Sequence, residues 1–244
     1  HHRERLITIG CRIPRIKEKI PALPHFFSKD LSPFHPPPSH GVGDCLPLVT
    51  LRQAIGKLAV LDSRTFPKDS LDPFHCVPRW NEKQYFWMKN TPEGKSAFDN
   101  LICYECSHEN KEQESVFCEQ CGEELPRPNL VKDGKARIIK GFRTSYRRMK
   151  WDQPASTLTM NSGVISSDVK GHPDQHRVLS LREILILSTL DLPLWKKEYS
   201  FDGVKYGRTL KGEVFSSKLI REVIGESIPP LAMSCMVNHL HALE

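Results

Sequence analysis

The 244-residue chain carries a formal charge of +6, and 39% of its residues are hydrophobic. This composition excludes wholesale disorder, because there are enough apolar side chains to build a core. No apolar run approaches the roughly 20 residues that a membrane-spanning helix needs, and no signal peptide opens the sequence. We therefore expect a cytoplasmic protein without a membrane partner. The mild basic excess fits a polyanion such as a nucleic acid, although many ordinary proteins are this basic.

The first patterned segment is LITIGCRI at residues 6–13. Its apolar side chains alternate and form a nearly continuous run, which is typical of a strand that is covered on both faces. Residues 21–41 are rich in proline, and this favours irregular structure. Thr50 then opens the pattern TLRQAIGKLAVL, which predicts a short helix with Thr50 as its N-cap.

Four of the eight cysteines form two C-x-x-C pairs that are separated by eleven residues. Four thiolates at such spacing are typical of a structural zinc site, which has no open position for catalysis. The polar linking segment cannot build a core of its own, so metal binding would supply folding energy on the order of 10 kcal/mol. The alternatives are a redox dithiol and two disulfides, and the paired knuckles argue against both. The predicted ligands are Cys103, Cys106, Cys118 and Cys121, in a zinc ribbon at residues 99–126.

Residues 135–151 are dense in positive charge, with aromatic residues among the cations. Such a surface can bind phosphates while apolar atoms pack behind the cations or against sugars. The same composition equally fits a solvated pair of strands. Further along, Ser180 and Glu183 form a capping box that predicts a helix over LREILILSTL. Pro229 and Pro230 suit a first turn and predict the start of a last helix with an apolar stripe.

Three separated parts of the chain form a wider pattern. The first is HHRERLITIGC at the start of the chain. The second is RMKWDQPASTLT from Arg148, followed by HPDQHRVLSLRE from His172. The third is IGESIPPLA at residues 224–232. In this order and spacing they resemble the eighth, ninth and tenth motifs of the DNA (cytosine-5)-methyltransferase family, and VTLRQAIGKL resembles the start of its target-recognition region. The departures are His1 in place of a glutamine, STLDLP at residues 188–193 where the family more usually has LQ-x-F-P, and Glu226 in place of an asparagine.

The resemblance implies an α/β fold class. The chain would form the C-terminal portion of a doubly wound methyltransferase sheet, together with a small mixed, loop-rich target-recognition domain that contains the four-cysteine zinc ribbon. Residues 1–14 would supply a strand of the catalytic domain. Residues 15–176 would form the target-recognition region with the ninth motif, and residues 177–244 the helices that complete the catalytic domain.

The resemblance also implies a reaction and a set of site residues. Enzymes of this family flip a cytosine out of the duplex, add a cysteine thiolate to C6, and transfer a methyl group from S-adenosylmethionine to C5. By similarity, Arg5 would reach the cytosine O2 with Arg3 beside it, and Ser227 and Glu226 would border the methyl-donor pocket. The residues expected to contact duplex DNA are Arg143, Arg147, Arg148, Thr157, Thr159 and Arg177.

Other parts of the family's machinery are missing from this sequence. It contains no Pro-Cys dipeptide, no glutamate in a Glu-Asn-Val setting and no glycine turn for the methyl donor. We therefore expect an N-terminal catalytic half, either a separate subunit or a removed segment, that carries the nucleophile and binds most of the S-adenosylmethionine. Alone, the chain should not methylate DNA. The protein would belong to a restriction–modification system of a prokaryotic or phage type, and it would associate with the nucleoid in the cytoplasm. The alternative function is that of a non-catalytic, zinc-stabilised DNA-binding module.

Overall fold

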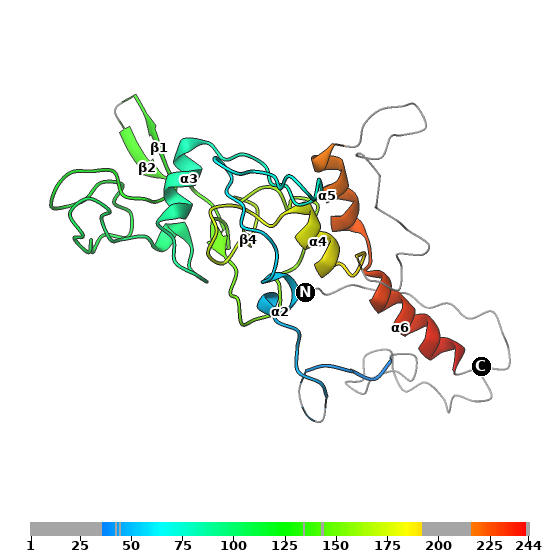
Figure 1. Ribbon diagram of the computed structural model, residues 1–244. Coiled ribbons are helices and arrows are strands. Elements are labelled where there is room, and N and C mark those ends of the chain that lie inside the picture. Colours follow the sequence, from blue (N-terminus) through cyan, green and yellow to red (C-terminus); the bar gives the residue numbers. More distant parts are fainter. Residues whose placement is uncertain are drawn as a thin grey trace.

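The structure is a computed structural model, and it describes residues 36–41, 43, 45–133, 135–142, 144–191 and 216–242. These residues form a small mixed α/β fold with long loops and two short sheets (Figure 1). The strand predicted at 6–13 lies outside the described residues. The elements are α2 (Leu51–Ile55), α3 (Glu82–Lys89), the 3-10 helix η1 (Ala97–Asp99), β1 (Asn129–Lys132), β2 (Lys135–Ile138), β3 (Arg147–Arg148), β4 (Val169–Gly171), α4 (Leu181–Leu187), α5 (Ser217–Glu226) and α6 (Pro230–His241).

The predicted helix starts are confirmed. The Thr50 hydroxyl accepts from the backbone N–H of Gln53, and Ser180 does the same for Glu183; both are full capping boxes. Such caps satisfy N–H groups that the first helical turn leaves without a partner. The last helix begins at Pro230 as expected. Helices α3 and α5 were not predicted, and α4 ends at Leu187, before the end of its apolar pattern.

The main core lies between α2, α4 and the end of α5. Leu51, Ile55, Leu181, Ile184 and Ile224 pack there with residues of the 149–158 segment. The first turn of α2 also donates to that segment, from the N–H of residue 51 to the carbonyl of residue 153 at 2.9 Å and from residue 52 to residue 151 at 2.9 Å. Segments far apart in the sequence therefore form one packed body.

A second cluster packs around α3. Trp87 and Tyr146 meet edge to face with ring centroids 5.5 Å apart, and Met88 is fully buried. Next to this cluster, β3 and β4 pair in parallel, whereas β1 and β2 form an antiparallel hairpin. Of the aromatic residues in the basic segment, Tyr146 and Trp151 are buried and support the fold from behind, whereas Phe142 is 79% exposed.

Helix α6 extends away from the rest of the described chain (Figure 1). None of its residues is buried, and Leu231 and Val237 of this helix are 42% and 53% exposed. The sequence pattern thus predicted the helix, but none of its residues belongs to a core cluster within the part of the chain that the structure describes. None of the described helices is long and apolar enough to cross a bilayer.

Candidate metal centre and nucleic-acid interface

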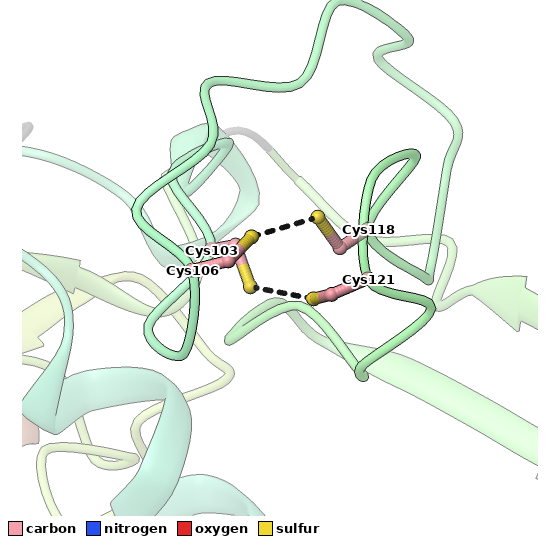
Figure 2. A group of neighbouring side chains, drawn as sticks. All are labelled: Cys103, Cys106, Cys118 and Cys121. Carbon is pink, nitrogen blue, oxygen red and sulfur yellow. Dashed lines mark hydrogen bonds between the residues drawn. The ribbon is translucent and has the colours of Figure 1, made fainter.

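The four paired cysteines meet in space, as the spacing predicted. Figure 2 shows their sulfur atoms turned toward a common centre, and all four lie within 4.8 Å of one another. The Sγ atoms of Cys103 and Cys121 are 3.6 Å apart, as are those of Cys106 and Cys118. Corners of a tetrahedron with metal–sulfur bonds of about 2.3 Å lie about 3.8 Å apart, whereas a disulfide needs about 2.05 Å. The geometry fits a metal ion and not a pair of disulfides.

Two matching turns present the cysteines. In the first, the N–H of Ser107 donates to the carbonyl of Cys103 at 3.0 Å; in the second, the N–H of Gly122 donates to that of Cys118 at 3.0 Å. Ser107 and Gly122 both have a left-handed backbone, with φ of 59° and 78°. This conformation suits glycine at position 122 and costs more at Ser107.

The thiols strongly perturb each other's protonation. Burial raises the pKa of Cys118, but backbone N–H groups of Cys121 and Gln120 and the neighbouring thiols outweigh it, so the pKa falls to about 6. The Cys121 thiol accepts a stabilising N–H from Glu123, yet burial and the three other cysteines raise its pKa to about 12. Four thiolates at this distance repel each other, so full deprotonation requires a cation among them. The donor set fits a closed, structural zinc site.

A buried arginine joins the ribbon to the rest of the protein. Arg127 is 2% exposed, and its guanidinium donates to the carbonyl oxygens of Ser115, Phe98 and Gln113 at 2.7–3.0 Å. The side-chain amide of Asn100 adds bonds to the carbonyls of Trp87 and Pro126. Sequence reasoning missed both residues, since nothing near them in the chain marks a cation or an amide as an interior anchor.

The structure places two of the predicted DNA contacts inside the protein. Arg148 is 2% exposed and donates to the carbonyls of Met88, Thr91, His172 and Gln175 at 2.6–2.7 Å, and to Nδ1 of His176 at 3.0 Å. Burial lowers the pKa of its guanidinium to about 10, so it stays charged near neutral pH. With every donor aimed at an internal partner, Arg148 holds loops together and does not fit the predicted direct contact with DNA.

Arg177 is the second correction. It is fully buried and pairs with Glu183 through two bonds of 2.7 Å, the two-pronged geometry that a guanidinium and a carboxylate favour. Burial by itself would raise the pKa of Glu183, but Arg177 more than offsets this and lowers it. Glu183 also accepts the N–H of Ser180, so the ion pair secures the start of α4. A DNA phosphate cannot reach this guanidinium in the described structure.

The remaining predicted contacts are nearer the surface. Arg147 is half-buried, donates to the carbonyl of Gly94 at 3.3 Å, and lies 3.8 Å from the Asp99 carboxylate. Thr157 and Thr159 are partly exposed, and the buried Lys170 ammonium donates to the carbonyl of Thr157 at 2.6 Å. Arg3, Arg5 and Arg143 lie outside the described residues.

The segments that resemble the ninth and tenth motifs are in direct contact. A Cβ atom at Gly225 would lie 2.1 Å from the backbone N of Met160 and 2.3 Å from the carbonyl carbon of Thr159. Only glycine permits this approach of α5. Ser227 caps the end of α5, where its hydroxyl donates to the carbonyl of Ile224 at 2.8 Å, and Glu226 beside it is exposed.

Comparison with known proteins places these features in a family context. No protein-family model matches the sequence. Over 202 residues the chain is 32% identical to the Type II methyltransferase M1.HgaI of Avibacterium volantium. The chain is a homologue of a Type II methyltransferase. The match covers 79% of this chain but 44% of the relative, so the chain spans less than half of that protein's length. The match supports the methyltransferase part of the sequence resemblance, whereas the cytosine-5 chemistry stays a prediction.

Proposed function

We propose that this methyltransferase homologue is the C-terminal part of a DNA (cytosine-5)-methyltransferase. It would recognise duplex DNA and supply part of the cytosine and S-adenosylmethionine pockets. The contact at Gly225 carries the proposal, because it joins the segments that match the ninth and tenth motifs into one physical unit. The match to a Type II methyltransferase and the order of the motifs support it.

The residues of this chain indicate which parts of the reaction it would support and which parts an N-terminal half would supply. S-adenosylmethionine would supply the methyl group, held largely by an N-terminal half that carries the Pro-Cys nucleophile. Arg5 would donate to the cytosine O2 with Arg3 beside it, since an arginine keeps its charge and its donors at any working pH. Glu226 and Ser227 would border the methyl donor. The tetrad of Cys103, Cys106, Cys118 and Cys121 would hold Zn²⁺, which stabilises the ribbon and takes no part in the reaction.

Reconstitution tests the proposal. The chain is mixed with an N-terminal half that contains the Pro-Cys dipeptide, together with duplex DNA and labelled S-adenosylmethionine. We expect 5-methylcytosine only when both halves are present, and none when the nucleophilic cysteine of the N-terminal half is replaced by serine. In the same assay Arg5→Ala should reduce methylation far more than duplex affinity. A folded complex of the two halves that produces no 5-methylcytosine would refute the enzymatic assignment.

A second candidate is a non-catalytic, zinc-stabilised DNA-binding module. The absent Pro-Cys dipeptide and the cationic segment at 135–150 favour it. The two candidates differ in the genomic sequence upstream of the coding region. A reading frame with Phe-x-Gly-x-Gly, Pro-Cys and Glu-Asn-Val motifs favours the enzyme, and the lack of one favours the module. In either case the protein would act on nucleoid DNA in the cytoplasm.

A further inference from the structure

The β1–β2 hairpin has two chemically different faces. Its register pairs Leu130 with Arg137 and Lys132 with Lys135, and because side chains alternate along a strand, these four residues share one face. All four are exposed. The opposite face begins at the buried Asn129, whose side-chain amide donates to Glu124 at 2.7 Å and so fixes the base of the hairpin to the ribbon.

The cations on the exposed face have no acidic partner among the residues that the structure describes. Within the described part of the chain, Lys132, Lys135 and Arg137 form no ion pair. Lys132 lies directly opposite Lys135, an arrangement of like charges that destabilises an isolated hairpin. A bound polyanion would reduce the repulsion between these two lysines, which lowers the stability of the free protein.

The surroundings limit where a polyanion can bind. The hairpin stands out from the rest of the described chain beside α3, at the end of the molecule opposite α6 (Figure 1). The neighbouring ribbon, residues 99–126, contains eight acidic residues and a single lysine, and four thiolates around one Zn²⁺ ion would add further negative charge. Phosphates are therefore repelled by the ribbon and attracted by the hairpin.

We propose that the face formed by Leu130, Lys132, Lys135 and Arg137 enters the major groove of duplex DNA. This inference rests on the proposed function and names the element that would read the target. A two-stranded ribbon fits the width of the major groove. Near the tip, the two lysines contact phosphates as point charges. Behind them, the Arg137 guanidinium faces the acceptor edge of a guanine, and Leu130 beside it offers an apolar contact to a thymine methyl group.

The lysine contacts are tested by binding measurements at several salt concentrations. Full-length chain and the Lys132→Gln/Lys135→Gln variant are titrated with a mixed-sequence duplex by fluorescence anisotropy. Loss of two phosphate contacts lowers the salt slope by about 1.8, so between about 50 and 200 mM salt the wild type should lose about tenfold more affinity than the variant. The control is Lys57→Gln/Lys68→Gln, which makes the same charge change at two exposed lysines outside the hairpin and should keep the wild-type slope.

The groove contact is tested with DNA in which 7-deazaguanine replaces guanine, since this removes the N7 acceptor from the major groove and leaves the minor groove unchanged. The wild type should bind this DNA about fivefold more weakly than ordinary DNA, and Arg137→Gln should bind both alike. Two results would overturn the hairpin inference while leaving the proposed function in place, provided that the wild type binds duplex DNA. One is a lysine variant with the same salt slope as the wild type. The other is an Arg137→Gln protein that loses as much affinity for 7-deazaguanine DNA as the wild type does. If the wild type binds no duplex at all, the proposed function falls with the hairpin inference.

Discussion

Replacing Arg148 separates an interior role from a role in DNA binding. Arg148→Ala removes the donors from four backbone carbonyls, those of Met88, Thr91, His172 and Gln175. A buried acceptor that loses its partner costs about 1–3 kcal/mol, so four of them amount to about 4 kcal/mol even when some regain water. That is a large share of the roughly 5–15 kcal/mol that stabilises an ordinary domain.

The assay combines stability and binding. A loss of about 4 kcal/mol in a domain of this size should lower the Tm by about 8–16 °C in thermal unfolding. Arg148→Lys should fall between wild type and Ala, because a compact ammonium keeps the charge but cannot reach all four carbonyls. Below the lowered Tm, the folded variants should bind duplex DNA with an affinity and a salt slope close to those of the wild type.

The contrary result is equally clear. An Arg148→Ala protein with an unchanged Tm and a salt slope reduced by about one contact would show that the guanidinium faces phosphate. The buried position of Arg148 in this structure would then not represent the DNA-binding form. An Arg137→Gln protein serves as the matched comparison, because Arg137 is an exposed cation with no ion pair among the described residues and its loss should leave the Tm unchanged.

Three further predictions follow from the metal centre, the close helix contact and the buried ion pair. Cys118→Ser should release zinc and unfold the ribbon while the main core persists; metal analysis and proteolysis report this, and wild-type protein without bound zinc would contradict it. Gly225→Ala should cost about 3 kcal/mol, because its methyl group would overlap the backbone of Met160; denaturant unfolding equal to that of the wild type would show that α5 does not pack so closely. Stability should fall as the pH drops below 6.5, because burial lowers the pKa of His172 and the unfolded chain therefore takes up a proton before the folded chain does. It should fall again below pH 4.5, because Arg177 lowers the pKa of Glu183 in the folded chain and this ion pair is lost when Glu183 is protonated. Thermal unfolding from pH 8 to pH 3 checks both windows. Burial lowers the pKa of His176 as well, so a His172→Asn protein should lose less stability below pH 6.5 than the wild type but should still lose some. A loss equal to that of the wild type would show that His172 does not contribute.

The features that could be predicted are those whose causes lie a few residues apart. Thr50 and Ser180 cap the helices that they precede, and both caps use a side chain three residues ahead. The cysteine tetrad was predicted from two short spacings, because each C-x-x-C turn positions its sulfur atoms without help from the rest of the chain. The sequence also pointed to the methyltransferase relationship, since its motifs keep their order along the chain.

Long-range packing decided what those local patterns left open. Arg137 and Arg148 belong to the same cationic segment, yet Arg137 is exposed and Arg148 is buried. The difference arises because the loops that converge on Arg148 come from positions as distant as residues 88 and 175. The approach of Gly225 to Met160 likewise depends on how α5 packs. Short sequence spacings by themselves determined the metal ligands and the helix starts. Only the tertiary structure determined which cations donate to buried carbonyls and which remain exposed, because burial depends on residues that are distant in sequence.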